Sequence, residues 1–200
     1  MSAIATPPAP AGATTPPPAP HPAWPRPWRW TIEQYRRLEP TRIFDGLKTM
    51  LIAGEIYVTP LPDPPHNTAL GLAAEYLRAA FPVGHHVRNQ MAFDIGTEDD
   101  PGPGLAVVVG LISDYAAEQP TSAVLIVEVV LSSLAVDTTK KAEQCATAGV
   151  PDYWVIDVGN RQLIVFRDPE PLPRDLGATA YKSRTVFGPT DTVAPLAAPG

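Results

Sequence analysis

Glu128 is the residue whose setting in the sequence most strongly indicates chemistry. It follows the run Val-Leu-Ile-Val (124–127) and precedes Val129 and Val130, a pattern typical of a buried strand. An unpaired carboxylate in such a strand costs several kcal/mol, or its pKa rises until it holds a proton. Glu128 therefore needs a partner: a lysine, an arginine or a bound metal ion. The alternatives are a purely structural ion pair and an edge strand that exposes the carboxylate.

Lys141 is the partner that the spacing favours. It lies four residues after Asp137, which we expect to be the N-cap of a helix ending at Gly149. Side chains lean toward the N-terminus of their helix, so Lys141 would reach back toward the end of the Glu128 strand. We therefore expect Glu128 to be largely buried and paired with Lys141 or another cation. Taken alone, Lys141 would be read as a surface lysine, and we expect Lys140 to point elsewhere and be solvated.

Glu55 is the third candidate, and the histidines are weaker ones. Glu55 lies at an expected turn between two short strands in residues 50–58, where a glutamate is ordinarily a solvated charge. His66 precedes an expected helix, and we interpret it as a turn residue. His85 and His86 are too isolated for a zinc site.

The elements that would position these residues form a mixed α and β pattern. Apolar periodicity and capping signals predict helices over 31–38, 68–81 and 137–149, the first with Thr31 as N-cap and Gln34 completing a capping box. Runs rich in β-branched residues predict two strands within 50–58 and further strands over 87–95, 105–109, 123–130, 153–157, 162–167 and 180–187. The expected fold class is α+β or α/β, with a mixed central sheet flanked by helices.

The composition excludes several classes of protein. No run approaches the ~18 apolar residues of a membrane helix, and the N-terminus lacks the basic start and apolar core of a secretory signal. Cys145 is the only cysteine, which excludes internal disulfides and cysteine-cluster metal sites. A cytoplasmic protein is the default expectation. The net charge of −6 does not favour broad contact with phosphates, so any nucleic-acid role must rest on a local site.

Proline marks the two ends of the chain. Of the 26 prolines in 200 residues, ten precede Trp28, although proline averages only roughly 5% of residues in proteins. Residues 1–29 are rich in Pro, Ala and Thr, almost uncharged, and unable to build a core. We therefore expect a disordered tail over 1–29, one domain over 30–188, and a flexible Pro/Ala-rich tail over 189–200.

Four motifs occur in a recognisable order. They are Leu-Ile-Ala-Gly-Glu-Ile (51–56), Pro-Gly-Pro-Gly-Leu-Ala-Val-Val (101–108), Val-Glu-Val-Val-Leu-Ser-Ser-Leu (127–134) and Ala-Gly-Val-Pro-Asp-Tyr-Trp-Val-Ile-Asp (148–157). This order resembles the Uma-type family of restriction endonuclease-like proteins, a branch of the PD-(D/E)xK nuclease superfamily in which the lysine has moved onto the following helix. The resemblance covers about residues 30–167 and implies a restriction-endonuclease-like fold with a carboxylate cluster at the edge of the sheet.

The resemblance also implies roles for the candidate residues. Glu55, Glu128 and an aspartate would ligate Mg²⁺ or Mn²⁺, ions that prefer oxygen ligands. Glu128 and Lys141 would be catalytic, with the lysine helping to orient or activate the attacking water. His66 matches a histidine that is often found in the family.

The chain departs from the family pattern at the aspartate. The Pro-Asp pair of the family corresponds here to Pro103 and Gly104, and glycine has no side chain to offer a metal. Asp99 and Asp100 lie four or five residues upstream and would substitute only if their loop folded back. The departure implies weak metal binding and a weakened or lost active site.

Two functions follow as hypotheses. The first is a metal-dependent DNA endonuclease of the Uma type, with DNA as partner and a homodimer as one expected assembly, because such enzymes often cut both strands as dimers. The alternative is an inactive pseudo-nuclease that binds nucleic acid or protein through the retained scaffold. Convergence of Glu55, Glu128 and Lys141 in one cleft would support a nuclease ancestry.

Deleting residues 2–26 should leave the stability of the domain unchanged, because this segment has little apolar surface to bury. In urea denaturation, the midpoint and the slope of the truncated chain should match those of the full chain within error. A clear loss of stability would show instead that the segment docks on the domain.

Overall fold

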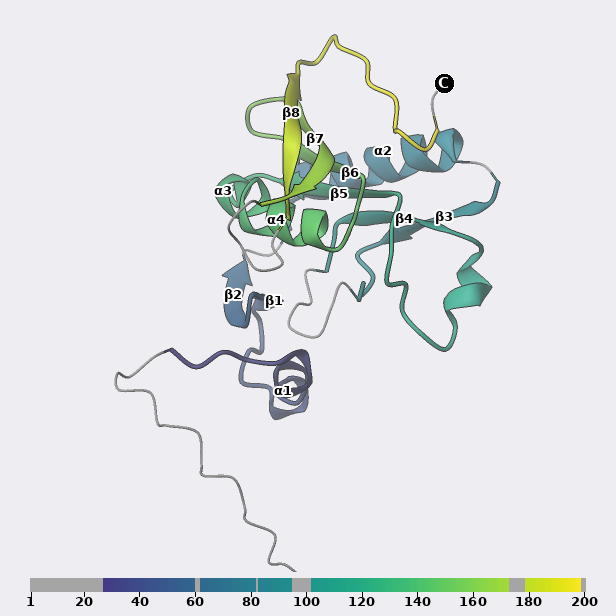
Figure 1. Ribbon diagram of the computed structural model, residues 1–200. Helices are drawn as coiled ribbons and strands as arrows, with labels where there is room; N and C mark the ends of the chain where they lie inside the picture. The colour runs from purple at the N-terminus through teal and green to yellow at the C-terminus, as the bar shows by residue number, and fades with distance from the viewer. Residues whose placement is uncertain (1–26, 60–61, 82, 95–101, 173–178, 199–200) are drawn as a thin grey trace, which may run out of the picture.

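A six-stranded mixed sheet forms the centre of the molecule (Figure 1). The computed structural model describes residues 27–59, 62–81, 83–94, 102–172 and 179–198. The strands lie across the sheet in chain order: β3 (His85–Asn89), β4 (Leu105–Val109), β5 (Leu125–Val130), β6 (Asp152–Asp157), β7 (Gln162–Pro171) and β8 (Thr179–Phe187). β5 and β6 are parallel, and the other neighbours are antiparallel.

Helices cover both faces of this sheet. α2 (Pro64–Ala80) packs on one face, while α3 (Leu134–Asp137) and α4 (Lys140–Thr147) follow β5 and lie on the other. Successive residues of a strand point to opposite faces of the sheet. In β5, Leu125, Val127 and Val129 pack in the apolar core between the sheet and α2. Ile126 and Val130 pack in the apolar core between the sheet and α4. Glu128 therefore lies on the α4 face. Within the described ranges, no helix is long and apolar enough to cross a membrane.

Residues 27–59 form an N-terminal arm that Figure 1 shows below the six-stranded sheet. The arm contains α1 (Ile32–Arg36), the 3₁₀ helix η1 (Glu39–Thr41), and the antiparallel pair β1 (Lys48–Ile52) and β2 (Glu55–Thr59). Its β1–β2 turn needs Gly54, because that residue has φ +72° and a Cβ there would lie 3.0 Å from the Cβ of Arg29.

Most of the expected elements are present. The capping box of Thr31 and Gln34 is confirmed at the start of α1, and the strands at 105–109 and around 123–130, 153–157, 162–167 and 180–187 are confirmed as β4 to β8. The mixed sheet flanked by helices is also confirmed as the fold class.

Two boundaries differ from the expectation. α2 begins at Pro64 rather than residue 68, because the Asp63 side chain accepts a hydrogen bond from the backbone N–H of His66 and proline suits the first turn of a helix. The strand expected over 87–95 ends at Asn89, because Gln90 has φ +49° and leaves the extended conformation. The end of that expected strand, and nearly all of the tail expected over 1–29, lie outside the described residues.

The helix expected to start at Asp137 is a third difference. Asp137 is not an N-cap: it is the last residue of α3, and its side chain is buried. Thr139 has φ −123° and ψ −85°, which is not helical, so it separates α3 from α4. The chain therefore turns between Asp137 and Lys140, and this turn places Asp137 beside the first turn of α4.

The described part of the C-terminal segment makes hydrogen bonds to the sheet, while the flexible tail expected over 189–200 stays a prediction. The fully buried Asp152 accepts hydrogen bonds from Trp154 Nε1 at 2.7 Å and from the backbone N–H of Leu196 at 2.9 Å. Arg167 contacts Asp152 through Nε at 2.9 Å and donates to the carbonyl of Ala194 at 2.7 Å. Asp152 thus joins β6, β7 and the C-terminal segment.

Replacing Asp152 by Ala should destabilise the fold by about 3 kcal/mol, because it leaves buried donors without an acceptor and Arg167 without its counter-ion. Urea denaturation would measure the change. Asp45→Ala is a matched control, because it removes an exposed ion pair with Arg42 and should change stability by less than about 1 kcal/mol. Equal stability of the two variants would contradict this role of Asp152.

Candidate functional site

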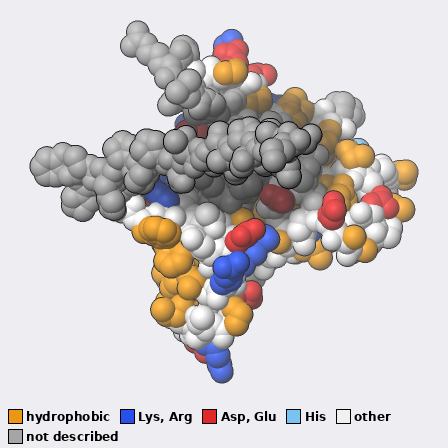
Figure 2. All heavy atoms as spheres, turned by 60° about the horizontal axis from the view of Figure 1, so that its bottom comes forward, with side chains coloured by type: hydrophobic (Ala, Val, Ile, Leu, Met, Phe, Trp, Pro, Cys, Tyr) orange, Lys and Arg blue, Asp and Glu red, His pale blue; other side chains and the backbone are white. Residues whose placement is uncertain are grey.

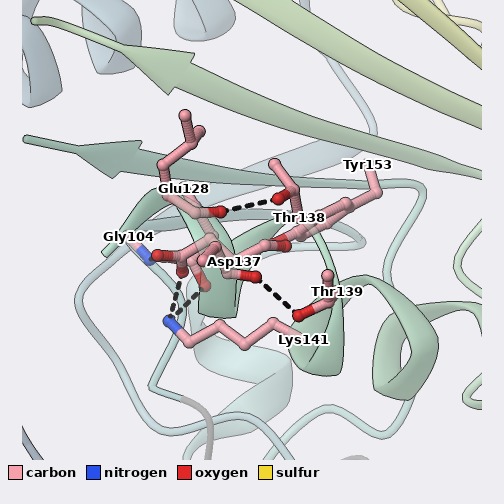
Figure 3. Close-up of polar contacts among 9 residues, drawn as sticks. Gly104, Glu128, Asp137, Thr138, Thr139, Lys141 and Tyr153 are labelled. Carbon is pink, nitrogen blue, oxygen red and sulfur yellow. Dashed lines mark hydrogen bonds and ion pairs between the residues drawn. The ribbon is translucent and has the colours of Figure 1, made fainter. Parts of the chain in front are cut away.

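Three buried charged side chains meet between β5 and the first turn of α4 (Figure 3). The ammonium group of Lys141 lies 3.0 Å from Glu128 Oε1 and 3.0 Å from Asp137 Oδ1. The exposed fractions of the three residues are 6% for Glu128, 4% for Lys141 and 2% for Asp137. The expected burial of Glu128 and its pairing with Lys141 are therefore confirmed. We call these three residues the charged triad.

The order of elements explains how the triad forms. β5 points Glu128 to the face that α3 and α4 cover, and Lys141 reaches back from the first turn of α4. The sequence reasoning missed Asp137 as the second partner, because it assigned that residue to a helix cap. The signal was available: an acid four residues before a lysine is the spacing at which the two side chains can pair along a helical segment.

The triad carries an excess of negative charge, with two carboxylates for one ammonium group. Burial raises the pKa of Glu128 and Asp137 raises it further, against the lowering effect of Lys141 and of the Gly104 N–H. Burial alone would lower the pKa of Lys141, but the two carboxylates outweigh it and hold that pKa above its ordinary value. The lysine thus stays charged, while Glu128 is the group that gains most from an additional cation or a proton.

Gly104 lies next to Glu128, one of the two acids of the triad. Its backbone N–H donates to Glu128 Oε2 at 3.2 Å, and a Cβ built at Gly104 would lie 3.6 Å from the same oxygen. That Cβ would also lie 3.0 Å from the carbonyl oxygen of Val127, so a side chain here fits only tightly. A carboxylate at position 104 would therefore stand next to Glu128.

The triad opens into a pocket of about 270 Å³ that lies between the sheet and the N-terminal arm. Glu128, Asp137 and Lys141 line one side. The arm lines the opposite side with Tyr35, Lys48, Thr49 and Met50. Further lining residues include His66, Gln90, Ser132 and Ser133. His66, which we interpreted as a turn residue, lies in the first turn of α2 and lines this pocket.

Glu55 is not among the residues that line this pocket. Its Oε1 lies 2.7 Å from Arg29 Nη1, and its Oε2 accepts from the Tyr57 hydroxyl at 2.6 Å and lies 3.1 Å from Lys140 Nζ. The hydrogen bonds from Tyr57 and Lys140 lower the pKa of Glu55 to about 2. The structure therefore brings Glu128 and Lys141 together and places Glu55 in a separate cluster. Lys140, expected to be solvated, is half exposed but paired with Glu55.

A divalent metal ion in the pocket would meet two carboxylates of the triad, those of Glu128 and Asp137. Mg²⁺ in proteins keeps several waters and is often bound by one or two carboxylates together with substrate phosphates. Glu128 and Asp137 are ligands of this type, and together they carry more negative charge than Lys141 neutralises. Among the described residues, however, no group of three or more His, Cys, Asp or Glu side chains could hold a metal. Asp99 and Asp100, the alternative ligands, lie outside those residues.

Variants of Glu128 should show whether the shape or the charge of its side chain contributes to the stability of the fold. Glu128→Gln keeps the shape of the side chain and removes the excess charge, so it should be tolerated, whereas Glu128→Ala should destabilise the fold by roughly 1–3 kcal/mol. The raised pKa adds a pH dependence. The contribution of Glu128 to stability is fully present below its ordinary pKa of 4.5 and is lost as the pH rises through its folded-state pKa.

In urea denaturation, Glu128→Gln should therefore gain stability relative to the unmodified protein as the pH rises above the ordinary carboxyl pKa of 4.5. An Ala variant as stable as the unmodified protein, or a Gln variant whose relative stability falls with rising pH, would contradict this account.

The comparisons with known proteins agree with this fold. The chain is similar in fold to a crystal structure described as a putative nuclease belonging to DUF820 from Anabaena variabilis, with a TM-score of 0.61 and 17% sequence identity over 83% of this chain and 88% of that one. No curated protein matches the chain. The model of the Uma2 family, whose description is "Putative restriction endonuclease", matches residues 32–199. The chain therefore belongs to the Uma2 family of restriction endonuclease-like proteins.

Proposed function

We propose that this protein hydrolyses phosphodiester bonds of DNA with the help of a divalent metal ion, at a slow rate. The observation that carries the proposal is the place of Gly104 beside Glu128. The charged triad keeps an acid pair and a lysine of nuclease type, while the neighbouring position has lost the carboxylate that the family pattern supplies. A site of this kind should bind metal weakly and position the attacking water loosely.

The residues of the triad have separate tasks in this proposal. Glu128 and Asp137 would hold the ion, which when bound offsets negative charge and makes its bound water a better nucleophile. Lys141 holds the two carboxylates in place and offers a positive charge to the phosphate that enters the pocket. The metal role that the family resemblance implies for Glu55 stays a prediction, since Glu55 has partners outside the pocket.

DNA binding must rest on local contacts. In Figure 2, which turns the arm end of the molecule toward the viewer, the visible basic and acidic side chains lie mixed and form no broad basic face. The net charge of −6 agrees with this picture. Lys48, which lines the pocket from β1, adds one positive charge near the triad. We therefore expect weak DNA affinity.

The alternative is an inactive module that binds nucleic acid or protein. One observation favours it: Lys141 already pairs with both carboxylates of the triad, so an incoming cation competes with an internal one. A shift of even 1 Å in the position of reacting groups can cost on the order of 100-fold in rate. The two functions therefore differ in whether any cleavage remains.

Restoring a carboxylate at position 104 tests the proposal. Gly104→Asp should strengthen Mn²⁺ or Mg²⁺ binding in calorimetry and increase the cleavage of plasmid DNA. Gly104→Asn is the matched control, because it has the same steric cost against Val127 without the charge. Cleavage by Gly104→Asp should be lost again when Lys141→Ala is added.

The outcomes distinguish the hypotheses. Weak metal-dependent nicking by the unmodified protein supports the weakened nuclease, and its complete absence supports the inactive module. Robust cleavage by the unmodified protein would contradict the loss of a ligand and direct attention to Asp99 and Asp100. If Gly104→Asp changes neither metal affinity nor cleavage beyond Gly104→Asn, the assignment of this site is wrong.

A further inference from the structure

The cluster around Glu55 joins the N-terminal arm to α4. Glu55 and Tyr57 belong to β2, whereas Lys140 is the first residue of α4. Lys140 Nζ lies 3.1 Å from Glu55 Oε2, donates to the Tyr57 hydroxyl, and stands 4.7 Å from the centre of the Tyr57 ring. Arg29 binds the other carboxylate oxygen at 2.7 Å. Both oxygens of Glu55 are thus in use within this cluster.

Two neighbouring lysines of α4 therefore bind two different parts of the molecule. Lys141 binds the buried acids of the triad, and Lys140 binds the acid of the arm. The arm in turn supplies Tyr35, Thr49 and Met50 to the wall of the pocket that faces the triad. The distance of this wall from Glu128 and Lys141 thus depends on where the arm contacts α4.

We propose that the Glu55–Lys140 pair is a latch that holds the N-terminal arm against α4 and so sets the width of the pocket. Glu55 is then a positioning residue and not a metal ligand. The arm has need of such a contact, because a two-stranded sheet is at best marginally stable in isolation. Leu51 and Ile52 of β1 are buried, and Ile52 is the β1 partner of Glu55, so the latch lies at the buried end of the β1–β2 pair. Only the identity of the ligand in the pocket rests on the function proposed above.

Hydrogen exchange of β1 and β2 tests the latch without any ligand. An exposed ion pair contributes at most about 1 kcal/mol, so Glu55→Gln and Lys140→Gln should each accelerate amide exchange in β1–β2 by about two- to fivefold. The effect of the double variant should be smaller than the sum of the two single effects, because both substitutions remove the Glu55–Lys140 pair. Exchange in β1–β2 should also rise with salt, which screens exposed charges. The pair Lys182 and Glu170, also exposed and 3.0 Å apart, is the control, and its Gln variants should not change exchange in the arm.

Mn²⁺ titration separates the latch from the ligand role. A latch predicts that Glu55→Gln and Lys140→Gln change Mn²⁺ affinity in the Gly104→Asp background in the same direction and to a similar extent. A ligand role predicts that Glu55→Gln weakens Mn²⁺ binding, whereas Lys140→Gln removes one cation that competes for the Glu55 carboxylate and leaves binding unchanged or stronger. Unchanged exchange in both variants, or opposite effects on Mn²⁺, would overturn the latch. If no variant binds Mn²⁺, the proposed metal chemistry fails, while the exchange data still decide the latch.

Discussion

One lysine shared by two buried carboxylates is the interaction on which the site depends. Lys141 can reach Glu128 and Asp137 only because the chain turns between α3 and α4 and because β5 points Glu128 to the face that these helices cover. Removing two acids and a lysine from water is costly, and the cost is offset only when the hydrogen bonds are complete. The triad and the Gly104 N–H together complete them for Glu128. The same three side chains therefore contribute to the stability of the fold and to the chemistry of the pocket.

The sequence was sufficient to predict the core of this arrangement. A charge inside an apolar run must have a partner, and the direction of side chains on a helix indicated Lys141. The mixed sheet could be predicted for a similar reason, since its strands are bounded by turn signals and their apolar patterns are local. These inferences depend on physical rules that act within a few residues.

The rest depends on contacts between distant residues, which local rules do not describe. Because Thr139 is not helical, Asp137 ends α3 instead of capping α4, and it forms an ion pair with Lys141. The sequence around Glu55 also gives no sign of its pairing with Lys140, which lies 85 residues later in the chain. The start of α2 at Pro64 was missed, although proline suits the first turn of a helix, where its missing N–H has no partner within the helix.

The position of Glu128 within β5 also has a consequence for the folding of the sheet. β5 lies between β4 and β6, and all six of its residues are buried. The strand is nearly uniform in hydrophobicity, so apolar patterning alone would tolerate a shift of one residue in its pairing. Such a shift would turn Glu128 toward the apolar face covered by α2, away from Lys141. The buried charge would then have no counter-ion, so Glu128 disfavours the one-residue shift that the apolar pattern of β5 would tolerate.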